Sequence, residues 1–216
     1  MLCCKAPQRS KRRLASALGD GAATAAEHLL ACALEDLVAW PGEAVIAPAS
    51  DQDAEWFHAG LGRRFETFVQ RGSSLGARIN HVDAVLRSCG RERLIYIGAD
   101  CPALDPAYLA SADRALDDND AVIGPATDGG VVLMGARRPW PDIGDLAWST
   151  PQLREDLCAR LRMQGWLIAN LETLADVDTI EDLTAASDGL VSDERCARRA
   201  LVDWLRSSEL LEAAIS

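Results

Sequence analysis

The feature that most constrains the fold is a short apolar run, Leu94–Ile97, which ends directly in Gly98-Ala99-Asp100-Cys101-Pro102. The run shows no alternation of apolar and polar residues, which is typical of a strand buried on both faces, as in a parallel sheet covered by helices. Other short apolar runs predict further strands at residues 1–4, 44–47, 65–69, 121–123, 131–134 and 166–171.

Segments with helical periodicity separate these runs. Between residues 22 and 40 the apolar residues recur with the spacing of a helix, and Pro41-Gly42 ends it. Similar segments predict helices at 52–60, 75–89, 106–116, 151–164, 179–187 and 192–214. Because strands that alternate with helices indicate βαβ units, we expect an α/β fold in which a mostly parallel, mixed central sheet lies between two layers of helices.

Composition limits the classes of partner. The chain has 216 residues, close to one full-sized domain, and its 33 acidic and 22 basic residues give a formal net charge of −11. So acidic a chain is a poor candidate for binding nucleic acid or an anionic membrane surface, where affinity comes from Lys and Arg. No apolar run has the length of a membrane span, and we expect no signal peptide. The seven cysteines include no Cys-x-x-Cys pair, which fits reduced thiols and a cytoplasmic location.

Asp100 is the first candidate for a functional residue. It follows a buried strand, and ligands bind beyond the carboxyl ends of the strands in sheets of this kind. A carboxylate there suits a hard divalent cation, which is commonly held by one or two carboxylates together with substrate phosphates. The alternative is that Asp100 only caps the next helix. Pro102 and Pro106 favour the start of a helix here. The residue spacing alone does not decide between the two roles.

A second acidic motif, Asp176-Val177-Asp178-Thr179, opens a predicted helix. Asp178 and Glu181 have the spacing of a capping box, so a structural role competes here with a role as a metal ligand.

A third motif, Asp128-Gly129-Gly130, lies between two predicted strands. Asp-Gly is a favoured hairpin turn. The functional alternative is that the glycines let a substrate approach the backbone while Asp128 meets its hydroxyl groups.

A basic loop stands out in this acidic chain. Lys5, Arg9, Lys11, Arg12 and Arg13 lie within nine positions, directly after the first predicted strand. Such a cluster predicts a phosphate-binding loop, although it lacks the glycine pattern of a P-loop. An exposed, solvated turn is the alternative. Cys101 has no histidine placed to activate it, so we expect an inert, buried thiol.

Taken in order, the motifs resemble those of a bacterial family in the glycosyltransferase-A, or nucleotide-diphospho-sugar transferase, superfamily, often labelled glycosyltransferases of arsenosugar biosynthesis. Phospholactate and molybdenum-cofactor guanylyltransferases are similar. The resemblance covers about residues 1–187 in six blocks: Lys5-Ala6-Pro7 with Lys11-Arg12-Arg13-Leu14, Gln70-Arg71-Gly72 with Leu75-Gly76-Ala77-Arg78, Gly98–Leu104, Gly124-Pro125 with Asp128-Gly129-Gly130, Trp148-Ser149-Thr150, and Asp176–Thr179 with Glu181-Asp182-Leu183.

The resemblance implies a fold and a set of roles. The fold is the glycosyltransferase-A, Rossmann-like three-layer sandwich over residues 1–187, and residues 188–216 are expected to form a helical extension packed on the same domain. Asp100 and Asp128 are implied to be catalytic, and Asp100 and Asp178 to hold Mg²⁺ or Mn²⁺. The nucleotide and its phosphates are implied to contact Lys5, Lys11, Arg13, Gln70, Gly72 and Arg78. The sugar or acceptor is implied to contact Gly129, Gly130, Trp148, Ser149 and Thr150.

The activity implied by the resemblance is metal-dependent transfer from a nucleotide-diphospho-sugar donor to a small-molecule acceptor. One alternative is a nucleotidyltransferase acting on a phosphorylated small molecule. Another is a non-catalytic member of the fold that binds nucleotides or serves as a scaffold, because the basic loop is shortened and Val131-Val132 replaces tyrosines usual in the family. The last predicted helix could also form a homodimer through Leu201, Trp204 and Leu205.

Overall fold

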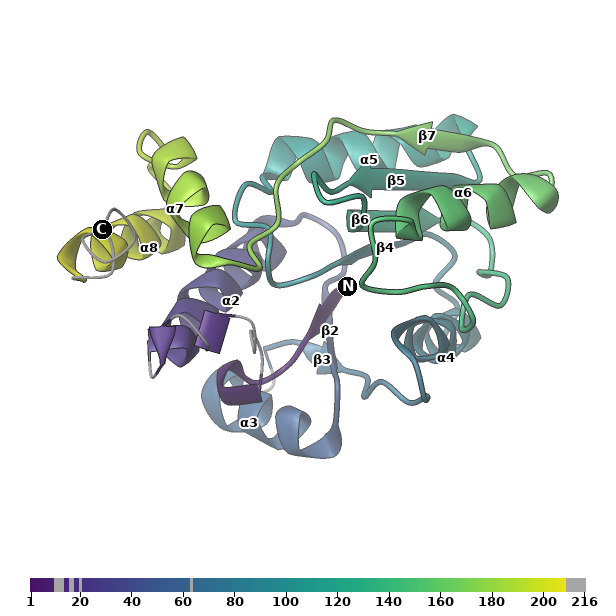
Figure 1. Ribbon diagram of the computed structural model, residues 1–216. Coiled ribbons are helices and arrows are strands. Elements are labelled where there is room, and N and C mark those ends of the chain that lie inside the picture. Colours follow the sequence, from purple (N-terminus) through teal and green to yellow (C-terminus); the bar gives the residue numbers. More distant parts are fainter. Residues whose placement is uncertain (10–13, 16–17, 20, 63, 209–216) are drawn as a thin grey trace.

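The computed structural model describes residues 1–9, 14–15, 18–19, 21–62 and 64–208 (Figure 1). Its strands are β1 (Leu2–Cys4), β2 (Val45–Pro48), β3 (Glu66–Thr67), β4 (Leu94–Ile97), β5 (Ala121–Pro125), β6 (Val131–Ala136) and β7 (Ile168–Asn170). Its helices are the 3₁₀ turn η1 (Pro7–Arg9), α2 (Gly21–Ala39), α3 (Asp51–Leu61), α4 (Leu75–Ser88), α5 (Pro106–Asp118), α6 (Leu153–Met163), α7 (Ile180–Gly189) and α8 (Cys196–Ser207).

The described strands form one seven-stranded sheet in the order β3-β2-β1-β4-β6-β5-β7. Strand β6 runs antiparallel to both of its neighbours, β4 and β5, and the other neighbouring pairs are parallel. The predicted α/β fold with a mostly parallel, mixed central sheet is therefore confirmed. Strand β4 lies in the middle of the sheet, which explains its continuous apolar run.

Helices cover both faces of the sheet. Successive strand residues point to opposite faces, so Ile46 packs with α3 and α5 residues on one face while its neighbours Val45 and Ala47 pack with α4 and α6 residues on the other. Figure 1 shows α5 and α6 on opposite sides of the sheet. This arrangement is the predicted three-layer sandwich.

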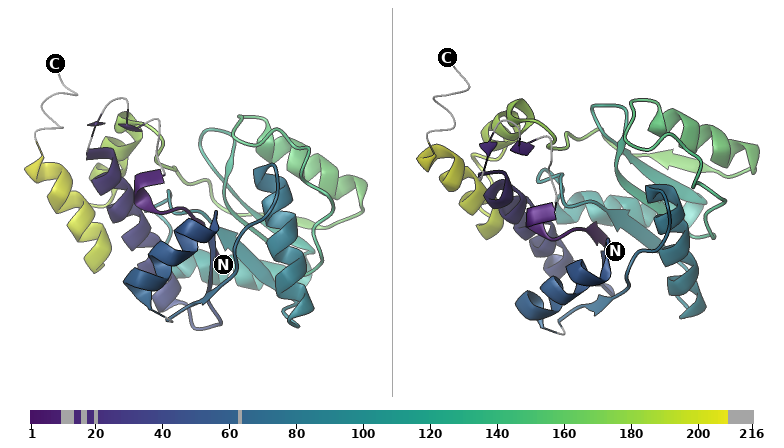
Figure 2. Two further views of the ribbon diagram at one scale, coloured as in Figure 1. Left: turned by 90° about the horizontal axis from the view of Figure 1, so that it is seen from below. Right: turned by 60° about the horizontal axis from the view of Figure 1, so that its bottom comes forward.

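A third apolar cluster joins the C-terminal helices to the outer side of α2. Leu29 and Cys32 of α2 pack there with Leu183 of α7 and with Leu201 and Leu205 of α8. In both views of Figure 2, α8 lies beside α2 at one end of the molecule. The helix predicted at 192–214 is observed as Cys196–Ser207, and residues 209–216 lie outside the described part of the chain.

The predicted dimer contact through α8 is wrong for two of its three residues. Leu201 and Leu205 are buried inside the chain against α2 and α7, so they cannot form an interface with a second copy. The third residue, Trp204, is partly buried and stacks on His28, with ring centroids 5.1 Å apart. The apolar stripe on this helix is thus explained by packing within the chain.

Two predicted strands are shorter than expected. The strand predicted at 65–69 is confined to Glu66–Thr67, although the backbone N–H of Phe68 still donates to Ile46 O of β2 at 2.9 Å. The strand predicted at 166–171 is observed as Ile168–Asn170, and the buried Trp166 that precedes it stacks on Trp140. None of the described helices is both long and apolar enough to cross a membrane.

The packing of α4 against the sheet gives a first testable prediction. Leu86 of α4 is fully buried, so Leu86→Ala should lower the free energy of unfolding by about 2–5 kcal/mol through lost burial and the cavity left behind. The control is Met163→Ala on α6, where the side chain is 82% exposed and the change should stay within about 0.5 kcal/mol. Urea denaturation of both variants measures the difference; equal losses would contradict the described packing.

Candidate active site

A cleft of about 770 Å³ lies at the carboxyl ends of β1 and β4, next to the turn that joins β5 to β6. This is the edge of an α/β sheet at which ligands are expected to bind. The structure brings most of the predicted site residues together here, since the cleft is lined by Lys5, Gln70, Arg78, Asp100, Asp128, Gly130, Trp148, Ser149 and Asp178.

Five predicted site residues are not found in the lining of the cleft. Gly72, Gly129 and Thr150 belong to described segments next to it but do not line it. Lys11 and Arg13 lie outside the described residues, so their predicted contact with phosphate stays a prediction.

Four carboxylates line the cleft: Asp100 after β4, Asp128 in the β5–β6 turn, and Asp176 and Asp178 before α7. Burial and the neighbouring carboxylates of Asp128, Asp100 and Asp178 raise the pKa of Asp176 to about 6. The neighbouring negative charges are therefore close enough to Asp176 to disfavour its ionised form. This concentration of negative charge is the electrostatic feature that distinguishes the site.

A backbone hydrogen bond joins the two halves of this acidic group. Val177 is fully buried, and its N–H donates to the carbonyl of Asp100 at 2.8 Å. In extended backbone, alternate residues point to the same side. The buried valine thus leaves both flanking aspartates, Asp176 and Asp178, on the cleft side.

Neither Asp100 nor Asp178 caps a helix. The N-cap of α5 is Asp105, which accepts from Tyr108 N at 2.6 Å. The N-cap of α7 is Thr179, which forms a capping box with Asp182. The predicted capping box of Asp178 with Glu181 is therefore wrong by one residue, and the capping alternative for Asp100 is wrong as well.

Basic side chains line the same cleft. Lys5 follows β1, Arg9 ends η1, and Arg78 lies in the first turn of α4, where its Nε donates to Gly72 O at 3.1 Å. The buried carboxylate of Asp53 shapes the turn after β1, because it accepts from Ala6 N at 2.9 Å and lies 3.9 Å from the guanidinium of Arg9. These contacts hold the start of the predicted phosphate loop at the cleft.

Gln70 and Gly72 stabilise the local structure, in addition to the nucleotide contacts predicted for them. The Gln70 amide is buried and donates to Ala47 O at 2.5 Å, which ties the segment after β3 to β2. Gly72 has φ 143°, and a Cβ there would lie 2.9 Å from the backbone of Ala77. Close packing of this turn on α4 therefore requires glycine.

The segment before α6 forms another wall of the cleft. The Trp148 indole N–H donates to Ile143 O at 2.9 Å, and Trp148 packs over Gly76, where a Cβ would clash with both residues. Ser149 has φ 65°, the only positive φ among the described non-glycine residues. Thr150 Oγ1 donates to Ala147 O at 2.7 Å. Strained backbone of this kind concentrates at functional sites.

Asp128-Gly129-Gly130 is both a turn and part of the site. The turn joins the antiparallel pair β5 and β6, with Ala126 N donating to Gly130 O at 3.0 Å, so the predicted hairpin turn is confirmed. Asp128 and Gly130 also line the cleft. Gly129 has φ 90° and packs against Pro151, and neither of these two residues lines the cleft.

The donor chemistry of the cleft fits a hard cation. Among the described residues, no group of three His, Cys, Asp or Glu side chains is arranged to hold a metal ion. The cleft does offer four carboxylates, and magnesium is usually bound by one or two carboxylates together with phosphate oxygens and water. The site thus fits a cation that is held jointly with a phosphorylated ligand.

Cys101 is an inert thiol. It is buried, and burial together with the Asp100 carboxylate raises its pKa to about 12. Burial and the raised pKa disfavour a thiolate nucleophile at this position.

Sequence reasoning did not select Asp176 as a site residue, although it lies beside Asp178. The available signal was the apolar residue between the two acidic ones, because a buried Val177 places both on one side of an extended segment. The apolar part of the cleft, to which Leu75, Ile79 and Leu153 contribute, was not predicted either.

A family model matches residues 16–150, and its description is "Uncharacterized protein conserved in bacteria (DUF2064)". The match spans more than half of the chain. No curated protein matches the chain significantly.

Several solved structures share the fold. A protein from Desulfovibrio desulfuricans G20, provisionally assigned as a nucleotide-diphospho-sugar transferase, is 26% identical, with a TM-score of 0.87 over 98% of this chain and 97% of that chain. A nucleotidyl transferase from Methanothermobacter thermautotrophicus is 17% identical, with a TM-score of 0.58 over 88% and 98%. A CMP:2-keto-3-deoxy-manno-octonic acid synthetase complexed with CTP is 17% identical, with a TM-score of 0.52 over 90% and 99%. All three likenesses confirm the predicted fold, and the likeness to the Desulfovibrio protein also supports the predicted superfamily.

The β5–β6 turn gives a prediction for the site. Gly129→Ala should lower the free energy of unfolding by about 2 kcal/mol or more, because φ is positive and the new Cβ would lie 2.1 Å from Pro151 O. Gly60→Ala is the control, since Gly60 lies in α3 with open space around it and should gain up to about 1 kcal/mol. Thermal denaturation compares the two; a neutral Gly129→Ala would show that the turn is wrongly described.

Proposed function

We propose that this chain, which belongs to the DUF2064 family, is a transferase that takes a nucleotide-diphospho-sugar donor together with Mg²⁺ or Mn²⁺ and a small-molecule acceptor. The observation that carries the proposal is a single cleft in which four carboxylates lie together with the basic side chains of Lys5, Arg9 and Arg78. The likeness to the Desulfovibrio protein, at 26% identity, supports the donor class.

Each part of the cleft has a role in the proposal. Asp100 and Asp178 would hold the cation, which supplies electrostatic stabilisation of the negative charge that develops on a leaving diphosphate. Lys5 and Arg78, with Lys11 and Arg13 of the same basic loop, would bind phosphate oxygens through charge-assisted hydrogen bonds. Gln70 and Gly72 would shape the nucleotide side of the cleft.

The acceptor side lies at the β5–β6 turn and the wall before α6. Asp128 would accept a hydrogen bond from the attacking hydroxyl and orient it toward the sugar carbon. Gly129, Gly130, Trp148, Ser149 and Thr150 would bind or shape the pocket for the sugar and the acceptor. Gly130 exposes backbone without a side chain, which allows close approach of a ligand.

The alternative activity is nucleotidyl transfer to a phosphorylated small molecule. It is supported by the shared fold with the Methanothermobacter nucleotidyl transferase and with the synthetase that binds CTP. In that reaction the phosphorylated acceptor would attack the α-phosphorus of a nucleoside triphosphate, and pyrophosphate would leave. The same side chains would position the two reactants. A non-catalytic, nucleotide-binding member of the fold is the second alternative.

The cysteines support the proposed compartment. All seven are free thiols, and four of them are buried. Free thiols persist where glutathione and thioredoxin keep them reduced, which supports a cytoplasmic location.

A nucleotide panel tests the proposal. Nucleoside mono-, di- and triphosphates and nucleotide sugars are added with Mg²⁺, with Mn²⁺ or with EDTA, and the thermal midpoint is measured. A ligand at about 100 times its Kd adds about 2.7 kcal/mol, which corresponds to a rise of about 5–10 °C for a chain of this size. We expect this rise for at least one diphosphate nucleotide, and only with metal present.

The outcomes of the panel separate the candidate activities. Release of a nucleoside diphosphate from a nucleotide sugar plus acceptor supports glycosyl transfer. Pyrophosphate release from a nucleoside triphosphate, without sugar transfer from any donor, would replace the proposal by nucleotidyl transfer. No shift with any nucleotide would favour the non-catalytic alternative.

Substitution of the two proposed metal ligands gives a sharper prediction. Because neither residue caps a helix, Asp100→Asn and Asp178→Asn should leave the thermal midpoint nearly unchanged or raise it by relief of carboxylate repulsion. Metal-dependent nucleotide affinity should fall tenfold or more, with the larger loss in Asp100→Asn. The expected loss is about 1.4 kcal/mol or more of binding free energy.

Calorimetric titration of Mn²⁺ with nucleotide measures this loss. The control is Asp118→Asn, which removes an exposed carboxylate at the end of α5 that does not line the cleft. Unchanged metal-dependent affinity in Asp100→Asn would show that the metal site is misplaced.

A further inference from the structure

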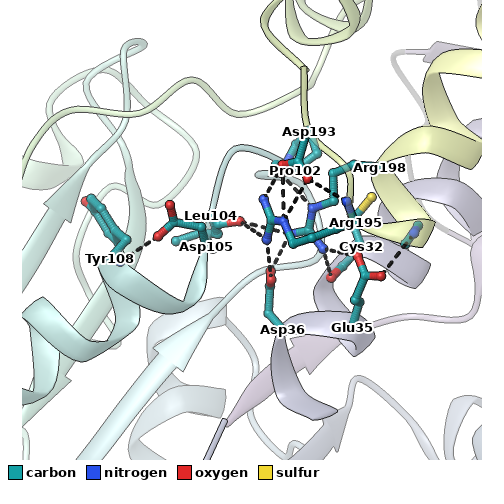
Figure 3. Close-up of polar contacts among 11 residues, drawn as sticks. Cys32, Glu35, Asp36, Pro102, Leu104, Asp105, Tyr108, Asp193, Arg195 and Arg198 are labelled. Atoms are coloured by element: carbon teal, nitrogen blue, oxygen red, sulfur yellow. Dashed lines mark hydrogen bonds and ion pairs between the residues drawn. The ribbon is translucent and has the colours of Figure 1, made fainter. Parts of the chain in front are cut away.

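The loop that carries Asp100 is held by two arginines of the C-terminal region. This loop, residues 98–105, joins β4 to α5 and has only one internal backbone hydrogen bond among the described contacts, from Leu104 N to Cys101 O at 3.2 Å. Figure 3 shows the guanidinium groups of Arg195 and Arg198 between this loop and α2. The loop geometry therefore depends on groups that are remote in the sequence.

Arg198 of α8 is fully buried, and each of its five N–H groups has a partner. Its Nε donates to Pro102 O at 3.1 Å and its Nη2 to Leu104 O at 2.9 Å, so it binds two carbonyls of the loop. The remaining donors bind α2, at Cys32 O, the Glu35 carboxylate and the Asp36 carboxylate. A guanidinium presents its five donors in a fixed fork, so these contacts set the distance and angle between α2 and the loop.

Arg195 repeats the connection from the residue that precedes α8. Its Nη1 donates to Leu104 O and to the Asp36 carboxylate, both at 2.9 Å. Its other donors bind Asp193. Leu104 O thus accepts from both arginines, which fixes the loop between Asp100 and the start of α5.

The opposite end of the loop is held by the acidic segment itself. Val177 N donates to Asp100 O at 2.8 Å, which couples the Asp100 backbone to the segment that carries Asp176 and Asp178. The loop is therefore held at two points, by Val177 on the cleft side and by the arginines on the α8 side. Only three residues without helix or strand structure separate Leu104 from Asp100, so a shift at Leu104 would be transmitted to Asp100.

We propose that Arg195 and Arg198 are positioning residues that set the placement of Asp100 toward the cation and phosphates. This inference rests on the proposed function, because it assigns the arginines a purpose in ligand binding beyond the folding of α8. Arg198→Met would leave the buried Asp36 carboxylate without its closest partner, and the variant can fail to fold. Arg195→Met and Arg198→Lys are therefore the test variants, since each keeps a positive charge beside Asp36.

The matched control is Leu201→Ala on the same helix. Leu201 is fully buried in the cluster of α2, α7 and α8, so its truncation destabilises α8 without removing a hydrogen bond to the loop. A purely structural role of the arginines predicts that all three variants behave alike once their loss of stability is taken into account.

The first measurement is hydrogen exchange by mass spectrometry, without any ligand. In Arg195→Met and Arg198→Lys, the amides of Val177 and Leu104, whose hydrogen bonds end on the loop, should exchange about tenfold faster than in Leu201→Ala, because a charge-assisted hydrogen bond to the loop is lost. Equal exchange in the three variants would overturn the inference.

The second measurement is binding of Mn²⁺, alone and with inorganic pyrophosphate, by calorimetry at a temperature where all variants are folded. We expect about three- to tenfold weaker binding in Arg195→Met and Arg198→Lys and wild-type binding in Leu201→Ala. Wild-type binding in all variants would overturn the positioning role, even if the loop exchanges faster. Absence of binding in the unmodified protein would instead contradict the proposed function.

Discussion

The rest of the site depends on one physical constraint, the repulsion among the four carboxylates that line the cleft. The contacts around the cleft must hold these carboxylates together despite that repulsion. Burial, together with the neighbouring carboxylates, raises the pKa of Asp176 to about 6, so ionising this carboxyl group costs the folded chain free energy. The fold opposes the repulsion with apolar burial of Val177, with its hydrogen bond to Asp100, and with the capping box that starts α7 at Thr179. A group of charges that destabilises the fold, and that neighbouring contacts nevertheless hold in place, is typical of a binding site.

A comparison with the other end of the sheet shows why charge alone does not make a site. A smaller cavity of about 320 Å³ lies at the amino ends of the strands, and it too is lined by charged residues. There the charges satisfy one another: Arg91 pairs with Glu43 and Glu66, and Arg93 pairs with Asp113 and Asp117. At the carboxyl ends, by contrast, four like charges are gathered in one cleft, where a bound cation would relieve their repulsion.

The fold was predictable from the sequence because local patterns and global architecture agree. Strand Leu94–Ile97 has a continuous apolar run because it lies between β1 and β6 in the middle of a sheet that helices cover on both faces. The glycines and aspartates that follow strands lie at the edge of the sheet where ligands bind.

Three features of the structure could not be predicted from the sequence. The register of the α7 cap depends on whether Asp178 with Glu181 or Thr179 with Asp182 forms the capping box, and the two pairs have the same spacing. The apolar stripe of α8 could not show whether its partner is α2 or a second chain. The hydrogen bonds of Arg195 and Arg198 could not be predicted, because their partners lie about 90 to 160 positions away in the sequence.

In the proposed function, the charge balance of the cleft gives a physical reason for a cation and an anionic ligand to bind together. The described lining carries four aspartates and the three basic residues Lys5, Arg9 and Arg78, so its formal charge is −1 when all are ionised. A diphosphate that enters alone meets net repulsion in a chain that is acidic overall, whereas one divalent cation reverses the sign of the described lining to +1. By linkage, any ligand whose affinity the cation raises must raise the affinity of the cation by the same factor. In the proposed function, the acidic chain would bind its phosphorylated substrate together with the metal, without a basic surface that would attract nucleic acid.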